Sequence, residues 1–334
     1  MSEKLLAIIV LNWNRLHYTK QTMECLIKKT TVPHVFVLVD NNSTDASGIR
    51  PYLSSITTAN TKAKQVIHVF NSKNLGVPGG RNSGIYAVEQ AGLKPEYLMT
   101  IDDDVIVPDN YDIQLTQACD KIPSLGITGI NVEPVKYTAR DINGVKVRPK
   151  TEGNLGGACL CLPRRVFARV GYYKVYGQYG LEDSDMHVRL KKIGLMGAYI
   201  DSRGIHLDED KDKVYRKVKD RAHKKGSTQL KAFVAARTQY EQTGNVFVPY
   251  MPYDPDDPKW ANYESFDGTI NAKMDLREVL DMFAETKGKP VGNKLVIGTD
   301  TIDTGAWVGN VPASVVVKIL EKVKEANIVY KLKE

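Results

Sequence analysis

The amino-acid sequence predicts an α/β fold in which helices flank a mostly parallel sheet, with a small α/β appendage at the C-terminal end. Short apolar runs alternate with segments of helical periodicity over residues 5–200. Alternating strands and helices are typical of βαβ crossovers, which place neighbouring strands parallel to one another. Each of the first apolar runs also stops at a cluster of polar residues, and a second, shorter series of helical and strand-like segments begins after residue 273.

The predicted elements follow one another along the chain. Apolar runs that are too short for buried helices predict strands at residues 5–11, 34–39, 65–70, 97–101, 126–132, 156–162 and 196–200. Helical spacing of apolar residues predicts helices at residues 17–30, 78–90 and 181–193. Residues 133–155 follow neither pattern, and we expect a polar, irregular excursion there.

Polar clusters follow four of the predicted strands, at residues 12–15, 40–45, 71–81 and 102–104. In a parallel sheet the carboxyl ends of the strands lie at one edge, and ligands bind beyond that edge. We therefore expect the four clusters to converge on a single binding site.

The length of 334 residues suggests about two domains. We assign residues 1–240 to the main α/β domain and residues 241–273, rich in Pro, Asp, Tyr and Asn, to a linker or wrapping segment. Residues 274–334 are assigned to a small C-terminal α/β module of unknown role. Its predicted elements are helices at 275–286 and 313–326 and strands at 294–298 and 328–332.

The composition excludes several protein classes. Apolar residues make up 42% and charged residues 25% of the chain, which argues against disorder and coiled coil. The longest apolar run, residues 5–11, is far below the roughly 20 residues of a membrane-spanning helix and lacks a cleavage site, so we predict neither a span nor a signal peptide. Four cysteines are too few for a disulfide framework, so we expect buried free thiols and a cytoplasmic protein.

The net charge of +7 is concentrated in one stretch. Residues 211–237 contain ten Lys or Arg against two Asp, a local charge of +8. Such a stretch fits contact with nucleic acid, anionic lipid or a phosphorylated ligand, and it equally fits a solvated helix face. These alternatives stay open at the level of sequence.

Three consecutive aspartates, Asp102, Asp103 and Asp104, end the fourth predicted strand. Their mutual repulsion makes such a cluster costly unless a cation neutralises it. Asp102 and Asp104 are two residues apart, a spacing that allows both carboxylates to reach one ion. Hard oxygen ligands suit Mg²⁺ or Mn²⁺, and these ions in turn bind a diphosphate.

The polar clusters together resemble the ordered motifs of family-2 glycosyltransferases with the GT-A fold, a Rossmann-like α/β fold. The matching residues begin with Asn12, Asn14 and Arg15, then Asp40, Asn42, Ser43 and Asp45, then Asn74, Gly76, Gly80, Arg81, Asn82 and Gly84, and then Asp102 to Asp104. The order continues with Gly157, the pair Glu182 and Asp183, Arg189, Gly194 and His206. The resemblance covers residues 5 to about 210.

The resemblance implies roles for individual residues. Asp40 resembles the carboxylate that binds the base of a nucleoside-diphosphate-sugar donor, and Asp104 resembles the ligand of a divalent cation, with His206 as a later ligand. Asp183 resembles the general base, with Glu182 as the alternative. Asp102 looks like the ribose-side aspartate and is also a candidate metal ligand. The remaining expected donor contacts are Asn12, Asn14, Asn42, Asn74, Gly76, Arg81 and Asp103, with Lys211 and Lys213 reaching the diphosphate from a closing segment.

These roles imply a metal-dependent, inverting glycosyltransferase that uses Mn²⁺ or Mg²⁺. Departure of a nucleoside diphosphate builds up negative charge that a cation stabilises, and a carboxylate takes the proton of the attacking hydroxyl. The favoured acceptor is a glycan or lipid-linked glycan. A hydroxymethylated pyrimidine in DNA, as in a phage-type modification pathway, is the alternative acceptor, and it would require base flipping in a duplex.

Two other classes of protein remain as alternatives. A sugar nucleotidyltransferase would also need carboxylates and metal, but residues 12–15 lack the glycine-rich, basic loop expected of one. A non-catalytic nucleic-acid-binding protein would explain the basic stretch but not three acidic motifs. The sequence makes no prediction about the oligomeric state.

Overall fold

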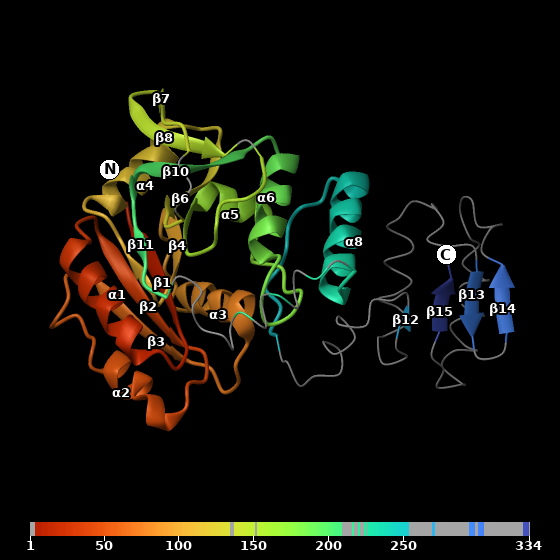
Figure 1. Ribbon diagram of the computed structural model, residues 1–334, viewed down its shortest axis with the longest axis horizontal. Helices are drawn as coiled ribbons and strands as arrows, with labels where there is room; N and C mark the ends of the chain where they lie inside the picture. Colours follow the sequence, from red (N-terminus) through yellow and green to blue (C-terminus); the bar gives the residue numbers. More distant parts are fainter. Residues whose placement is uncertain are drawn as a thin grey trace. The chain divides into compact units, whose positions relative to one another are not determined.

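In the computed structural model the chain forms two compact units (Figure 1). The first contains residues 1–224 and 246–255, and the second contains residues 225–245 and 256–334. The residues that the structure describes are 4–133, 137–150, 152–208, 216, 220, 224, 226–253, 269–270, 294–297, 300–303 and 330–333. Within these ranges, every helix is too short or too polar to cross a bilayer.

A nine-stranded sheet forms the centre of the first unit, in the spatial order β3-β2-β1-β4-β9-β6-β10-β8-β7. Its strands are β1 (Leu6–Asn12), β2 (His34–Asp40), β3 (Gln65–Phe70), β4 (Tyr97–Asp102), β6 (Leu125–Asn131), β7 (Arg140–Ile142), β8 (Val145–Lys150), β9 (Cys159–Pro163) and β10 (Met196–Arg203). The first four strands pair in parallel, as does β10 with β6. Strand β9 is antiparallel to β4 and β6, and the hairpin β7–β8 continues the sheet beyond β10.

The α/β fold class predicted from the sequence is confirmed, with one local correction. The prediction of an irregular excursion over residues 133–155 was wrong where β7 and β8 form. The alternation of buried Val145 and Val147 with exposed Lys146 marks a strand with one covered face. That signal spans only a few residues among many polar ones, so the sequence pattern missed it.

Helices cover both faces of the parallel strands. On one face, α1 (Leu16–Lys29), α2 (Ile49–Ser54) and α4 (Tyr111–Lys121) share a hydrophobic core with alternate residues of β1. On the other face lies α3 (Gly76–Gln90), which packs against β1, β2 and β3. The short α5 (Arg164–Val170) contacts β9 and α6 (Glu182–Lys192), and α6 contacts β10. A single 3₁₀ turn, η1 (Asp45–Ser47), precedes α2.

Two glycines let α3 approach the sheet closely. A Cβ at Gly84 would lie 2.4 Å from Cγ2 of Ile9, and one at Gly80 would lie 2.5 Å from Cδ1 of Leu11. The two glycines are four residues apart, so they occupy the same face of the helix. This close packing explains the glycine spacing of the sequence motif and fixes Arg81, which follows Gly80, at the carboxyl edge of the sheet.

A second, two-stranded sheet joins the acidic end of β4 to a distant part of the chain. Strands β5 (Val105–Ile106) and β11 (Ile205–His206) pair antiparallel, with His206 opposite Val105. The backbone N–H of Leu207 donates a 2.8 Å hydrogen bond to the carbonyl of Asp104. This pairing brings His206 beside Asp104.

Residues 246–253, within the predicted linker or wrapping segment, pack against the rest of the first unit. Val248 pairs with the chain at Gly171, where the N–H of Tyr172 donates to the carbonyl of Val248 at 2.9 Å. The ring of Tyr250 stacks on Tyr86 with centroids 3.9 Å apart. The four cysteines are free thiols, and three of them are buried as predicted, whereas Cys25 is only partly buried.

The second unit contains α8 (Thr228–Thr243) and a four-stranded antiparallel sheet. The sheet has the order β12-β15-β13-β14, with β12 (Thr269–Ile270), β13 (Lys294–Ile297), β14 (Asp300–Asp303) and β15 (Tyr330–Lys333). Strands β13 and β15 fall on the two segments predicted as strands. The predicted helices at 275–286 and 313–326 lie outside the described residues.

Candidate functional site

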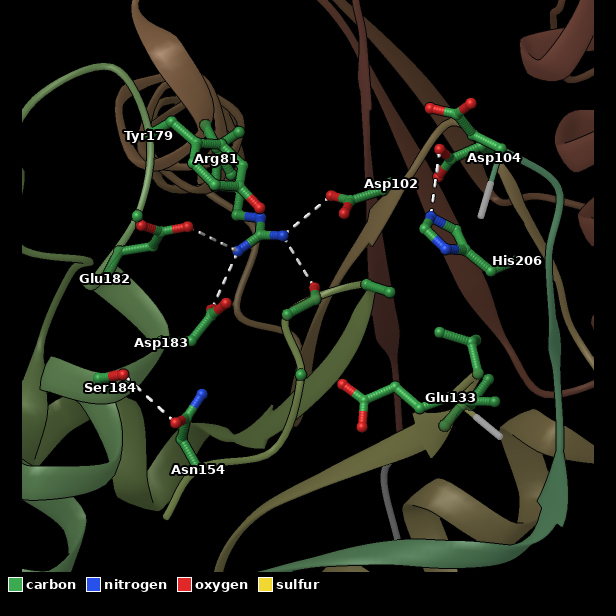
Figure 2. Close-up of a pocket in the computed structure, with 18 of the residues that line it drawn as sticks. Arg81, Asp102, Asp104, Glu133, Asn154, Tyr179, Glu182, Asp183, Ser184 and His206 are labelled. Atoms are coloured by element: carbon green, nitrogen blue, oxygen red, sulfur yellow. Dashed lines mark hydrogen bonds and ion pairs between the residues drawn. The ribbon is translucent and has the colours of Figure 1, made fainter. Parts of the chain in front are cut away.

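A pocket of about 300 Å³ lies at the carboxyl edge of the sheet in the first unit (Figure 2). It brings together six residues to which the sequence analysis assigned roles, from the end of β4, α3, α6 and β11: Arg81, Asp102, Asp104, Glu182, Asp183 and His206. Other lining residues include Arg15, Glu133, Asn154, Tyr179, Ser184, Tyr199 and Asp208. The convergence of the polar strand ends therefore occurs as expected for this group.

A smaller pocket of about 90 Å³ adjoins the first. The two pockets share Arg15, Val77, Asp102 and Tyr179. The smaller pocket also has an aromatic wall at Trp13 and amide groups at Asn41 and Asn74, and it includes Gly76 and Asp103. Aromatic faces with neighbouring amides suit a nucleobase or a sugar ring.

Arg81 joins the two acidic groups of the larger pocket. Its Nη2 donates to Oδ1 of Asp102 and to the carbonyl of Gly157, both at 2.8 Å. Its Nη1 donates to Oδ1 of Asp183 at 3.1 Å and lies 3.9 Å from Oε1 of Glu182. Figure 2 shows the guanidinium between Asp102 on one side and the Glu182–Asp183 pair on the other. Because Arg81 is only 2% exposed, this buried charge is balanced entirely by its neighbours.

The Glu182–Asp183 pair opens α6, where the positive end of the helix favours acidic side chains. Burial, and then the nearby charge of Asp183, raise the pKa of Glu182 to about 7. Burial also raises the pKa of Asp183, while Arg81 opposes that rise. A carboxylate with a raised pKa is a better proton acceptor near neutral pH, so the pair is suited to general base catalysis.

Gly157 provides the space for Asp183. A Cβ at Gly157 would lie 2.0 Å from Oδ2 of Asp183, a distance that no real side chain could keep. The preceding loop is held by His187, whose Nε2 accepts a 3.1 Å hydrogen bond from the N–H of Leu155. Burial lowers the pKa of His187 to about 4, so the ring is neutral and can accept this bond. His187 thus helps to position the pocket wall that faces Asp183.

The three aspartates at the end of β4 point to different partners. Asp102 pairs with Arg81, whereas Asp103 and Asp104 both pair with Arg15. Asp103 is 2% exposed, and burial raises its pKa to about 7. Burial also tends to raise the pKa of Asp104, but hydrogen bonding from His206 and the charge of Arg15 prevail and lower it.

Asp104 and His206 are the pair best suited to a divalent cation. Nε2 of His206 lies 3.3 Å from Oδ2 of Asp104. The other oxygen, Oδ1, is buried and has no hydrogen-bond partner among the described residues, so its lone pairs are available to an ion. No group of three His, Cys, Asp or Glu side chains in the described ranges is arranged as a complete metal site. One or two protein ligands completed by phosphate oxygens are nevertheless the usual coordination of Mg²⁺, so these residues fit such an ion.

Four predicted donor contacts lie outside the two pockets. Asn12 and Asp40 are fully buried. The side-chain amide of Asn12 donates to the carbonyls of Val10 and Val39, and Asp40 accepts from the N–H of Ser43 at 2.9 Å and from Nε of Arg50 at 2.6 Å. Asn14 and Asn42 adopt positive φ angles of 60° and 63° in the turns that follow β1 and β2. All four residues shape the loops around the site, and their direct contact with a donor stays a prediction.

The remaining predicted contacts, Lys211 and Lys213, lie outside the described residues. Sequence reasoning missed several residues that line the pockets, among them Trp13, Asn41, Glu133, Asn154 and Asp208. Asn41 and Asp208 were within reach, since Asn41 lies between Asp40 and Asn42 and Asp208 lies two residues after His206. Glu133 and Asn154 stand at the two ends of a segment that the sequence reading treated as irregular, so no pattern marked them.

Comparisons with known proteins concern the family and the fold. Residues 7–159 match the profile of glycosyl transferase family 2. The mannosyltransferase PcManGT from Pyrobaculum calidifontis, in complex with GDP-Man and Mn²⁺, has a TM-score of 0.50 at 13% identity, covering 96% of this chain and 80% of that one. GalNAc-T7 with UDP, GalNAc and Mn²⁺ has a TM-score of 0.48 at 14% identity, covering 88% and 60%, and TarS from S. aureus has 0.46 at 15%, covering 65% and 40%. No curated protein matches the chain significantly by sequence.

Proposed function

The protein is a glycosyltransferase whose residues 7–159 belong to glycosyl transferase family 2, and we propose that it is a metal-dependent, inverting enzyme. In this proposal the first unit moves a sugar from a nucleoside-diphosphate-sugar to an acceptor hydroxyl. The observation that carries the proposal is the single pocket that contains both the Asp104–His206 pair and the Glu182–Asp183 pair. The first pair suits the departing diphosphate, and the second suits the attacking hydroxyl.

The donor fits across the two adjoining pockets. The smaller pocket, with Trp13, Asn41 and Asn74, would hold the nucleoside, and Asp102 stands where the two pockets meet. Asp104 and His206 would hold a divalent ion, Mn²⁺ or Mg²⁺, which supplies Lewis-acid stabilisation to the leaving diphosphate. The neighbour PcManGT is complexed with GDP-Man and Mn²⁺, which supports a nucleotide donor and a divalent ion here as well.

Asp183 is the proposed base. Its carboxylate is held in place by Arg81 at 3.1 Å and lines the pocket into which an acceptor hydroxyl would enter. Taking the proton of that hydroxyl lets its oxygen attack the anomeric carbon from the face opposite the departing diphosphate, and a single displacement of this kind inverts the anomeric centre. Glu182 is the alternative base, since it also lines the pocket and its pKa is about 7.

The charge of the pocket favours an uncharged, hydroxyl-bearing acceptor such as a glycan or lipid-linked glycan. Six carboxylates line the larger pocket, whereas its arginines, Arg15 and Arg81, are both ion-paired. Nucleic-acid affinity depends on Lys and Arg that neutralise phosphates, so this lining disfavours a phosphodiester chain. DNA remains the alternative acceptor because of the basic residues 211–237.

The proposal is tested by incubating the purified protein with UDP-, GDP- and dTDP-linked sugars and Mn²⁺ and measuring release of the nucleoside diphosphate. We expect release from one donor class, loss of release in excess EDTA, and inversion at the anomeric carbon of the product. Release that persists in EDTA would exclude the metal, and no release from any donor would contradict the donor assignment.

The two acceptor classes are separated by a competition experiment. Neutral methyl glycosides and an oligonucleotide with hydroxymethylated cytosine are offered to the protein with the accepted donor. Transfer to a glycoside supports the glycan reading. Transfer to the oligonucleotide, with binding that weakens steeply as salt rises, would support the DNA reading instead.

A further inference from the structure

One guanidinium, that of Arg15, pairs with three nearly buried carboxylates beside the end of β4. Nη1 of Arg15 donates to Oδ2 of Asp104 at 2.9 Å and to Oδ2 of Asp208 at 3.1 Å, and Nη2 pairs with Oδ1 of Asp103. The three carboxylate side chains are 2–6% exposed, and that of Arg15 is 21% exposed. Arg15 is thus the counter-ion of this cluster in the nucleotide-free protein.

The position of Arg15 conflicts with a cation bound alone. Oδ2 of Asp104 accepts from Arg15 and also lies 3.3 Å from Nε2 of His206. A divalent ion held by Asp104 and His206 would place a second positive centre beside the guanidinium, and the two would repel each other at short range. While Arg15 stays on Asp104 and Asp208, an ion therefore binds this cluster weakly.

A diphosphate removes this conflict. Arg15 lines both pockets, and of the four residues that the pockets share it is the positively charged one. A nucleotide that runs from the smaller pocket into the larger one must pass this guanidinium. Arginine binds phosphate oxygens with two parallel N–H donors. The guanidinium then has a new partner and can release Asp104 to the ion.

We propose that Arg15 makes cation binding at this site depend on the nucleoside diphosphate. Arg15 holds Asp104 and Asp208 in the nucleotide-free enzyme and turns to the diphosphate when ion and nucleotide bind together. It is a positioning residue that blocks occupation of the site by an ion alone. This inference rests on the proposed function, because it assumes a nucleoside diphosphate and a divalent ion.

The test is Mn²⁺ binding, measured by electron paramagnetic resonance with Mn²⁺ alone and then with UDP or GDP. Without nucleotide, Arg15→Met should bind Mn²⁺ at least about 10-fold more tightly than the wild type, because the carboxylates lose their resident cation. With nucleotide, the difference should shrink, since Arg15 no longer competes. Arg15→Gln, which keeps a hydrogen-bond donor for Asp104, should also bind Mn²⁺ more tightly and serves if Arg15→Met does not fold.

Thermal melting gives a second readout with a matched control. Arg15→Met removes the guanidinium partner of the buried carboxylates, so its Tm should fall by about 6–20 °C, and Mn²⁺ alone should restore much of the loss. Arg50→Met likewise removes the partner of a buried carboxylate at a strand end, Asp40. Its Tm should fall too, but Mn²⁺ should not restore it, because among the described residues Asp40 pairs with Ser43 and Arg50 and with no histidine that could complete an ion site.

The outcomes separate this inference from the proposed function. Wild-type protein that binds Mn²⁺ alone as tightly as Arg15→Met would overturn the role of Arg15 and leave the metal-dependent reaction standing. Absence of Mn²⁺ binding to both proteins, with or without UDP and GDP, would overturn the metal-dependent function itself and the role of Arg15 with it.

Discussion

Replacing Arg81 by methionine tests how the site is held together. The guanidinium is 2% exposed and pairs with Asp102 at 2.8 Å and Asp183 at 3.1 Å. Loss of one partner of a buried ion pair costs about 3–5 kcal/mol. For a domain of this size, 1 kcal/mol changes Tm by about 2–4 °C. We therefore expect Arg81→Met to lower Tm by about 6–20 °C.

The same substitution should change the pH dependence of the reaction. Burial raises the pKa values of Glu182 and Asp183, and the charge of Arg81 lowers both. Without Arg81, both carboxyls keep their protons to higher pH, so less of the base is ionised at neutral pH. Activity rises with pH as the base ionises. In Arg81→Met we expect this rise, the acid limb of the pH–activity profile, to move about 1–2 pH units upward.

The assay combines thermal melting with the pH profile of nucleoside-diphosphate release. Arg81→Lys is the matched control, because it keeps the charge and loses the planar fork. Its Tm should lie below that of the wild type, but the acid limb of its pH–activity profile should stay close to that of the wild type. A wild-type Tm and profile in Arg81→Met would refute the reasoning, and a lowered Tm with an unmoved acid limb would refute the electrostatic part alone.

Four further predictions concern the same pocket. Asp104→Asn should abolish Mn²⁺-dependent donor binding, and calorimetry that finds donor affinity unchanged in Mn²⁺ would contradict this. Asp183→Asn should lower turnover by about 10²–10⁴-fold with donor binding intact; an active Asp183→Asn beside a dead Glu182→Gln would identify Glu182 as the base. The pKa of Glu182 in the folded protein is about 7, above its ordinary value of 4.5. Glu182 therefore contributes its full stabilisation below pH 4.5, and this stabilisation is lost as the pH rises to 7. Tm should fall with pH over this range, and Glu182→Gln should remove that fall. Gly157→Ala should displace Asp183, whose Oδ2 would lie 2.0 Å from the new Cβ, and reduce turnover; wild-type turnover would show that the loop yields.

The sequence could predict the acidic centre of the site because the topology of parallel strands determines it. Asp102 ends β4, Asp104 comes two residues later, and Arg81 follows the glycines of α3, so knowing that the strands before these residues are parallel is enough to place them together. The Glu182–Asp183 pair was predicted through its resemblance to the family-2 motif, since acidic residues at the start of a helical pattern are typical of any first turn and do not by themselves indicate a site.

Other parts of the fold and site depend on information that a local pattern does not contain. An apolar run predicts a buried strand but not its direction, so the antiparallel course of β9 could not be read from residues 159–163. The pairing of Arg15 with Asp208 joins residues 193 positions apart. It arises because β11 returns to pair with β5, and two-residue strands have no period to detect.

Asp40 and Asn41 are neighbours in the motif, but their side chains have different surroundings. Successive side chains of an extended chain point to opposite sides. Here Asp40 is engaged by Ser43 and Arg50, whereas Asn41 lines the smaller pocket. Asn41 in turn accepts from the N–H of Leu75 at 3.0 Å and donates to the carbonyl of Gly76 at 2.9 Å.

The loop that Asn41 holds ends at a position that only glycine can occupy. Gly76 has a φ of 67°, and a Cβ there would lie 2.1 Å from the carbonyl oxygen of Gln178. That carbonyl accepts a 2.7 Å hydrogen bond from the N–H of Val77, so the segment before α6 rests on the first turn of α3. Arg81 then extends from α3 to the pair that begins α6. The glycine and asparagine thus set the distance between the two helices, and the position of the Glu182–Asp183 pair depends on that distance.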